Sequence, residues 1–190
     1  MEKNNKRELP NELATYRYVN TGLEGGGSIY FMGFPGLTIA VDGSSFIHPL
    51  DMESTIVGLV EQGINYLVLL NEDHELPVNA KVDLKTCLTK YKIKLFELPV
   101  IDYGIPDSTG EYLWNIYLEE LLLSLKSCKS VGFCCLSGTG RSAMFAARLL
   151  VEIGSCPRKA MEMVRRKLDG AIETIEQESW IEKVKGKRDD

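Results

Sequence analysis

The sequence predicts an α/β fold with a central, mostly parallel sheet flanked by helices on both faces. Short apolar runs bounded by turn residues alternate with longer segments whose apolar residues recur at helical spacing. Strands that alternate with helices in this way favour crossover connections and therefore parallel pairing. The 190 residues are enough to bury one core, and the composition, 44% hydrophobic and 26% charged, is that of an ordinary globular protein.

The first half of the chain supplies three of the expected strands and one helix. Residues 28–34 follow a glycine run and predict a strand, and residues 37–41 predict a second one that Asp42 and Gly43 stop. A helix is expected to begin near Pro49 and to end before Gly63, where a glycine commonly follows the last helical residue. The mostly apolar residues 65–70 predict the next buried strand.

The second half repeats this alternation. Pro157 suits the first position of a helix, where its missing N–H is no loss. We expect strands over 93–100 and 131–136, and helices over 80–90, 110–127, 142–152, 157–168 and the closing segment EQESWIEKVK.

Composition and the ends of the pattern bound the class of protein. Residues 1–27 are expected to be a polar lead-in without a signal peptide, and residues 28–186 a single domain. No stretch is long and apolar enough for a membrane span, and a net charge of −5 argues against nucleic acid as a partner. The five cysteines lack CxxC or histidine spacing, so we expect reduced thiols in a cytoplasmic compartment and no metal. We also expect a monomer that needs no cofactor.

The segment VGFCCLSGTGRSA (131–143) combines a strand end, a glycine loop and a helix start. Such loops meet ligands at the carboxyl ends of strands, and a helix N-terminus presents free N–H groups and partial positive charge to an anion. Gly138 and Gly140 allow the backbone N–H groups to converge, and Arg141 adds a fork of donors suited to phosphate. The same positive surroundings favour a thiolate at Cys135. We therefore predict a nucleophile in an anion-binding loop, rather than a buried sulfur beside a capping glycine.

Cys135-Leu136-Ser137-Gly138-Thr139-Gly140-Arg141-Ser142 resembles the CxxGxxR(S/T) loop of the cysteine-dependent protein tyrosine and dual-specificity phosphatases. The resemblance implies a dual-specificity-phosphatase-like fold and a phosphocysteine intermediate. Residues 138–143 also match the loose dinucleotide pattern GxGxxA, but no ribose-binding acid follows in a βαβ unit. The late position of the loop argues against the low-molecular-weight phosphatases, and its glycine pattern against rhodanese-like domains. The resemblance implies that phosphate is bound by Leu136, Ser137, Gly138, Thr139, Gly140 and Arg141.

A phosphatase of this kind needs an acid for the leaving oxygen, and residues 97–107 (ELPVIDYGIPD) offer two. The resemblance to the family's general-acid loop selects Asp102, with Asp107 as the alternative or as a helix cap. A second match, residues 170–178 (GAIETIEQE), implies that Gln177 helps to place the hydrolytic water. From the residues alone, Thr174 and Gln177 also fit a capping box.

Two departures from the family pattern bear on activity and substrate. The family usually has His before the nucleophile, where this chain has Cys134; we expect Cys134 to pack in the strand rather than to form a strained disulfide with Cys135. Ser142 is expected to donate a hydrogen bond to the Cys135 thiolate. The loop also lacks the lysines that inositol-phosphate phosphatases commonly carry.

The sequence therefore predicts a cysteine-dependent phosphoric monoester hydrolase that acts on a phosphorylated protein. The expected substrate is phosphotyrosine, with phosphoserine or phosphothreonine as further possibilities. Cys135, Arg141, Asp102, Ser142 and Gln177 form the expected catalytic set. Two other functions stay open: a catalytically weak phosphate-binding or scaffolding domain, and a phosphatase of RNA 5′-ends or lipids.

Overall fold

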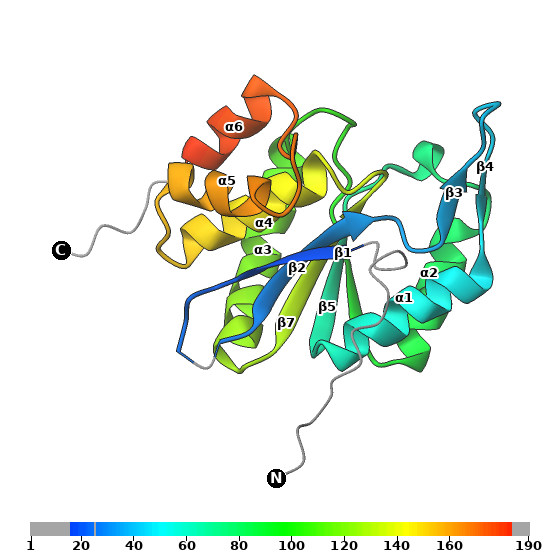
Figure 1. The fold of residues 1–190 in the computed structure, drawn as a ribbon, viewed down its shortest axis with the longest axis horizontal. Coiled ribbons are helices and arrows are strands. Elements are labelled where there is room, and N and C mark those ends of the chain that lie inside the picture. The colour runs from blue at the N-terminus through cyan, green and yellow to red at the C-terminus, as the bar shows by residue number, and fades with distance from the viewer. Residues whose placement is uncertain (1–15, 25, 184–190) are drawn as a thin grey trace, which may run out of the picture.

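A five-stranded sheet forms the centre of the molecule, in the computed structural model that describes residues 16–24 and 26–183. The strand order is β1-β2-β7-β5-β6, and every neighbouring pair is parallel except β1 with β2. The predicted mostly parallel sheet is thus confirmed (Figure 1). Its strands are β1 (Tyr16–Asn20), β2 (Ser28–Gly33), β5 (Ile64–Leu69), β6 (Lys94–Glu97) and β7 (Ser130–Cys135).

Helices cover both faces of the sheet, as predicted. Two helices pack on one face, and four pack on the other (Figure 1). The first pair is α1 (Pro49–Glu61) and α2 (Ala80–Lys90); the second group is α3 (Ser108–Lys126), α4 (Arg141–Glu152), α5 (Pro157–Arg165) and α6 (Ile175–Glu182).

Each face of the sheet has its own apolar core. Alternate residues of a strand point to opposite faces. In β7, Phe133 and Cys135 therefore belong to the core beneath α3 to α6, while Cys134 belongs to the core beneath α1 and α2. Helix α4 lies in the middle of its layer and is buried over most of its length. Because α4 begins at Arg141, its burial fixes the position at which the loop after β7 ends.

Two sequence expectations need correction at the start of the chain. Residues 16–20 were assigned to the polar lead-in, yet they form the edge strand β1, which pairs antiparallel with β2. Only Val19 of β1 is buried, and Arg17 and Asn20 are exposed, so the segment does not read as an apolar run. The rest of the expected lead-in before Tyr16 lies outside the described residues.

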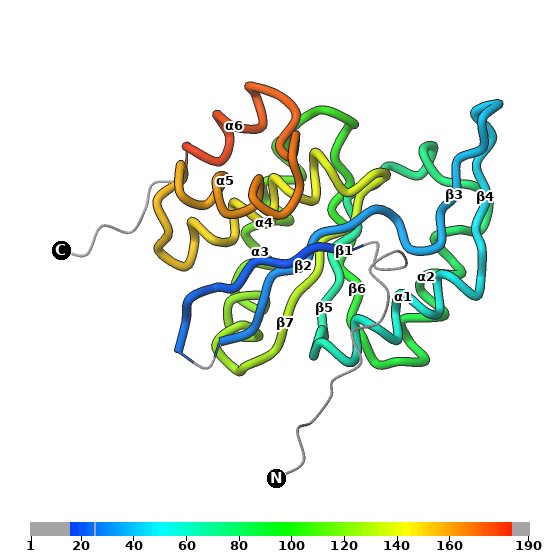
Figure 2. The backbone as a smooth tube through the Cα atoms, viewed as in Figure 1, coloured from blue at the N-terminus to red at the C-terminus, as the bar shows by residue number. Residues whose placement is uncertain are grey.

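The second correction concerns residues 37–41, which do not join the central sheet. Leu37–Ile39 (β3) instead pairs with Ser45–Ile47 (β4) in a separate two-stranded hairpin. The backbone tube shows this hairpin standing away from the sheet beside α1 and α2 (Figure 2). Ile39 and Phe46 are exposed in it, because neither strand contributes fully to a core.

The parallel strands bring several loops to one edge of the sheet. The segments after β5, β6 and β7 all leave the carboxyl ends of their strands there, including the 3₁₀ turn η1 (Asp73–Glu75). This edge is where α/β sheets commonly bind ligands. Within the described ranges, no helix is long and apolar enough to cross a membrane.

Candidate active site

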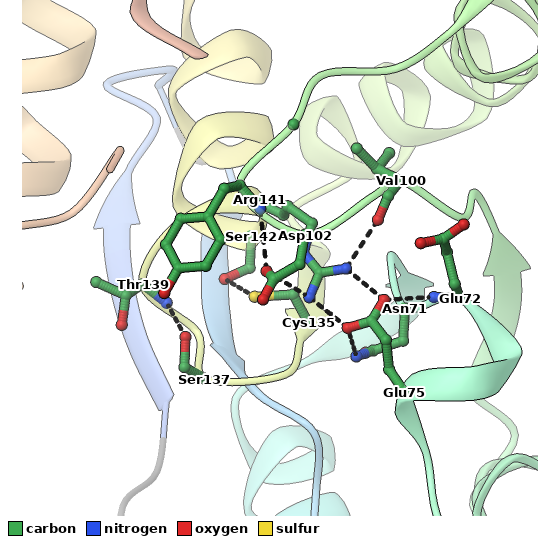
Figure 3. A network of polar contacts seen from close by, with 12 residues as sticks. Asn71, Glu72, Glu75, Val100, Asp102, Cys135, Ser137, Thr139, Arg141 and Ser142 are labelled. Carbon is green, nitrogen blue, oxygen red and sulfur yellow. Dashed lines mark hydrogen bonds and ion pairs between the residues drawn. The ribbon is translucent and has the colours of Figure 1, made fainter. Parts of the chain in front are cut away.

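The loop between β7 and α4 is packed so closely that only glycine fits at its centre. Gly138 has φ +87°, and a β-carbon there would lie 2.5 Å from the backbone nitrogen of Gly33 in β2. The left-handed conformation turns the Gly138 N–H back toward Cys135, and it donates to the Cys135 sulfur at 3.3 Å. The Cys135 thiol in turn donates to the Ser142 hydroxyl at 3.4 Å. The sulfur therefore has two polar partners near the start of α4, and Figure 3 shows its contact with Ser142.

Arg141, the first residue of α4, is 1% exposed and makes an extensive set of contacts (Figure 3). Its two terminal nitrogens donate to the two carboxylate oxygens of Glu75 at 2.6 Å each. One of them also donates to the Val100 carbonyl at 2.8 Å, and the other lies 2.9 Å from Asp102 Oδ1. Nε of Arg141 is buried and has no hydrogen-bond partner among the residues that the structure describes. A buried donor without a partner is costly, and here it sits in a loop built to receive an anion.

A backbone N–H and a side-chain amide from the preceding residues also hold Glu75 in place. Its carboxylate accepts from the Glu72 N–H at 2.7 Å and from the Asn71 amide at 3.2 Å. Burial alone would raise the pKa of Glu75, but the hydrogen bonds from Arg141, Glu72 and Asn71 and the charge of Arg141 bring it below its ordinary value. Burial alone would lower the pKa of Arg141, and Glu75, Cys135 and Asp102 raise it instead. Both partners are therefore held in their charged forms.

The two candidate acids occupy different environments. Asp102 lies beside Arg141 with its side chain 44% exposed, at the mouth of the loop. Asp107 caps the start of α3, where its carboxylate accepts from the Gly110 N–H at 2.8 Å. Helix capping thus accounts for Asp107, and Asp102 is the acid that faces the Cys135 loop.

The side chains of Cys134 and Cys135 point to opposite faces of the sheet. Cys134 packs with α1 and α2 on the opposite face, and burial, followed by the charge of Cys135, raises the pKa of Cys134 well above its ordinary value. All five cysteines lie within the described residues, and all are free thiols. Cys134 is therefore a packed neutral thiol in this structure, as the sequence predicted.

The segment before α6 lies against the loop. The Ile172 N–H donates to the Thr139 carbonyl at 3.0 Å, and a β-carbon at Gly140 would lie 2.2 Å from a Glu173 carboxylate oxygen and 3.3 Å from Gln177 Nε2. Thr174 caps α6 by accepting from the Gln177 N–H at 3.2 Å. The Gln177 side chain accepts from Glu173 N at 2.9 Å instead of from Thr174 N, so the predicted cap is present without the reciprocal bond of a capping box.

The structure brings together the expected residues and adds some that the sequence did not indicate. The remaining loop residues are held by backbone and side-chain contacts: Phe34 N donates to Leu136 O at 3.3 Å, and Thr139 N donates to Ser137 Oγ at 3.3 Å. Glu75 was missed because nothing in the acidic turn NEDHEL distinguishes it from a solvated carboxylate. The one usable signal was position, since the turn follows a strand that neighbours β7.

Glu173 was also missed. Desolvation raises the pKa of Glu173, the charge of Asp102 adds to the rise, and the charge of Arg141 opposes it. Taken together, the site brings together the Cys135 thiol, the Gly138 N–H that donates to it, the buried guanidinium of Arg141 and the partly exposed carboxyl group of Asp102. No group of three metal-ligating side chains occurs in the part of the chain that the structure describes.

The chain is similar to known proteins in sequence and in fold. No family model matches the sequence. The rat (Rattus norvegicus) cyclin-dependent kinase inhibitor 3 is 33% identical over 101 residues, which cover 52% of this chain and 46% of that protein. A probable protein tyrosine phosphatase type IVA A of Dictyostelium discoideum is 29% identical over 96 residues, 50% of this chain and 57% of that protein. The chain thus spans about half the length of the curated relatives it matches.

Solved structures match over more of the chain. A kinase associated phosphatase whose catalytic-site cysteine was replaced by serine superposes with a TM-score of 0.65 at 24% identity, over 81% of this chain and 83% of that one. Tk-PTP in its active form gives a TM-score of 0.59 at 25% identity, over 84% of this chain and 94% of that one.

Proposed function

Since this chain is related in sequence and fold to the cysteine-dependent protein tyrosine and dual-specificity phosphatases, we propose that it hydrolyses a phosphorylated protein through a phosphocysteine intermediate. One observation carries the proposal. The Cys135 sulfur, the buried Arg141 and the exposed carboxyl of Asp102 meet at one loop, with Asp102 2.9 Å from Arg141. This is the set that phosphoryl transfer to a thiolate requires.

The first step transfers the phosphoryl group to sulfur. The Cys135 thiolate attacks phosphorus, the S–P bond forms, and the bond from phosphorus to the substrate oxygen breaks. Arg141 and the loop N–H groups hold the equatorial oxygens, where negative charge is concentrated. Asp102 enters this step as the carboxylic acid and gives its proton to the leaving oxygen, so the alcohol or phenol departs neutral.

The second step hydrolyses the phosphocysteine. Asp102, now a carboxylate, takes a proton from water as the water oxygen attacks phosphorus, and the S–P bond breaks to release phosphate. The Ser142 hydroxyl lies 3.4 Å from the sulfur and donates to the thiolate as it leaves. Gln177, which lies against Gly140, is the residue expected to help place the water.

Several observations support a phosphorylated protein, and phosphotyrosine in particular, as the substrate. The similar proteins include a probable protein tyrosine phosphatase and a kinase associated phosphatase. Ile101 and Tyr103, which flank Asp102 in the chain, are 63% and 60% exposed. Exposed apolar groups at the mouth favour an aromatic leaving group. The absence of lysine between Cys135 and Arg141 argues against multiply phosphorylated inositols.

The test compares wild type with Cys135→Ser, Asp102→Asn and Asp107→Asn on p-nitrophenyl phosphate and on phosphotyrosine, phosphoserine and phosphothreonine peptides. We expect no turnover by Cys135→Ser and a loss of about 10²–10⁴-fold on the phosphotyrosine peptide for Asp102→Asn. Asp107→Asn is the matched control, because asparagine still caps a helix. Equal rates in all four proteins would overturn the mechanism. A loss in Asp107→Asn but not in Asp102→Asn, with Cys135→Ser inactive, would assign the acid to Asp107. Vanadate binding without any turnover by wild type would identify a phosphate-binding domain instead.

A further inference from the structure

The loop that carries Asp102 is fastened to the first turn of α6. The Thr174 hydroxyl donates to the Tyr103 carbonyl at 3.2 Å, and the Gln177 amide donates to the Gly104 carbonyl at 3.3 Å. Tyr103 and Gly104 are the two residues that follow Asp102. Two side chains from one helix turn therefore hold the backbone immediately beside the proposed acid.

The backbone at Tyr103 needs such support. Its φ is +58°, in the left-handed region that bulky side chains rarely adopt. A residue in this conformation costs on the order of 1–3 kcal/mol and persists only where its surroundings hold it. The Asp102 carboxylate adds a local bond by accepting from the Tyr103 N–H at 3.1 Å. The contacts with α6 and the ion pair of Asp102 with Arg141 are long-range bonds that hold this turn.

Gln177 is built into this contact rather than free to meet solvent. It is fully buried, and both ends of its amide are occupied: Oε1 accepts from Glu173 N at 2.9 Å, and Nε2 donates to Gly104. The Thr174 hydroxyl is hydrogen-bonded both as a donor, to the Tyr103 carbonyl, and as an acceptor, from the Gln177 N–H. The same segment is bound to the nucleophile loop through Ile172 and Thr139. Residues 172–177 thus contact both the loop that carries Asp102 and the loop that carries Cys135, whose relative position the reaction depends on.

We propose that Thr174 and Gln177 are positioning residues for Asp102, which hold the acid loop so that the carboxyl group faces the leaving oxygen. The inference rests on the proposed phosphatase function and assigns to Gln177 a role in the first step. The role expected for Gln177 from the family resemblance concerns the water of the second step. The two roles predict different kinetics.

Leaving groups separate the two roles. Proton donation matters most when the leaving oxygen is basic, as in phenol or tyrosine, and little when it is acidic, as in p-nitrophenol. The ratio kcat/KM reports the steps up to formation of the phosphocysteine. A defect in the position of Asp102 therefore lowers kcat/KM for phenyl phosphate more than for p-nitrophenyl phosphate. A defect in water placement leaves kcat/KM unchanged and causes a burst of phenol release followed by slow turnover.

The experiment measures kcat/KM for both esters with Thr174→Val, Gln177→Met, Thr174→Ser and the reference variant Asp102→Asn. Valine and methionine keep the volume and remove the hydrogen bonds, and serine restores the hydroxyl. We expect Thr174→Val and Gln177→Met to lose about 10–100-fold on phenyl phosphate and less than about 3-fold on p-nitrophenyl phosphate, the pattern of a misplaced acid. Thr174→Ser should stay close to wild type. Thr89→Val is the matched control, because the Thr89 hydroxyl bonds only to its own helix, α2, at the Lys85 carbonyl.

A second readout guards against a general loss of folding. The limb of the kcat/KM profile that falls at high pH reports the protonated acid. In the pH range where the acid is protonated, kcat/KM of Thr174→Val should fall for phenyl phosphate and stay at the wild-type value for p-nitrophenyl phosphate. A partly unfolded enzyme would instead lose kcat/KM for both esters. Equal losses on both esters, no loss on either, or a burst with unchanged kcat/KM would each overturn the inference while leaving the phosphatase function intact. A wild-type protein that cleaves neither ester would overturn both.

Discussion

Removing the Glu75 carboxylate should destabilise the fold far more than removing a surface carboxylate of the same charge. In Glu75→Ala, the guanidinium of Arg141 stays buried but loses both of its 2.6 Å bonds to the carboxylate, and Asn71 and the Glu72 N–H lose an acceptor. The side chains of Arg141 and Glu75 are only 1% and 7% exposed. Breaking a buried ion pair by removing one partner costs about 3–5 kcal/mol. For a chain of this size, that corresponds to a fall in Tm of about 6–20 °C.

The matched control is Glu97→Ala. Glu97 pairs with Lys81 and Lys85 at 2.6 and 2.5 Å, but its side chain is 33% exposed. An ion pair in that setting contributes about 0–1 kcal/mol. Thermal unfolding followed by circular dichroism measures both variants. If Glu75→Ala and Glu97→Ala had the same Tm, the view that the buried ion pair stabilises the fold would be refuted.

The pH dependence gives an independent check on the same pair. The pKa of Glu75 is lowered in the folded state, so its contribution to stability is fully present above the unfolded-state value of about 4.3 and is lost as the pH falls through the lower folded value. The difference in Tm between wild type and Glu75→Ala should therefore be constant near neutrality and should shrink below about pH 4. A difference that shrinks between pH 6 and 8 would contradict the assignment.

Three further predictions concern the loop itself. Gly138→Ala should abolish binding of vanadate, because a β-carbon there would lie 2.5 Å from the backbone of β2. Gly154→Ala is the control, because Gly154 has φ +103° and open space around it, so that the substitution should cost only backbone strain. Isothermal titration calorimetry with vanadate measures binding by both variants. Cys134→Ala should keep wild-type kcat/KM and lose about 1 kcal/mol of stability, because Cys134 packs on the far face of the sheet; a loss of activity in a folded protein would contradict this placement. Ser142→Ala should slow release of phosphate from the phosphocysteine by about 10–100-fold, since one hydrogen bond to a charged group is worth about 1.5–3 kcal/mol. Stopped-flow phenol release should then show a larger burst than in wild type.

The parts of the molecule that could be predicted from sequence are those governed by short-range pattern. The β7 strand, the glycine loop and α4 are consecutive in the chain, so their geometry follows from local residue types. The helices α2 and α3 match their predicted spans within two residues, because their apolar faces repeat regularly. Strand β6 was predicted as 93–100 and ends at Glu97, although Leu98 and Val100 still donate to the carbonyls of Leu69 and Leu70.

What could not be predicted depends on distant partners. Glu75 meets Arg141 only because β5 and β7 are neighbours in the sheet, and no local pattern marks a carboxylate that will be buried. The bonds from Thr174 and Gln177 to the acid loop join residues about seventy positions apart. For the same reason the edge strand β1 was overlooked: its partner β2 is what makes it a strand.

That edge strand has a practical consequence for work with shortened chains. A chain that begins at Ser28 would keep every residue to which chemistry is assigned, yet it would free the outer edge of β2, four of whose six residues are buried. Val19 and the tyrosine rings of Tyr16 and Tyr18, which pack on Tyr30, would be lost with it. A long apolar edge with unpaired N–H and C=O groups is a template for intermolecular pairing. Such a truncated protein should self-associate through β2. This aggregation would be a consequence of removing β1 and not a property of the full-length domain.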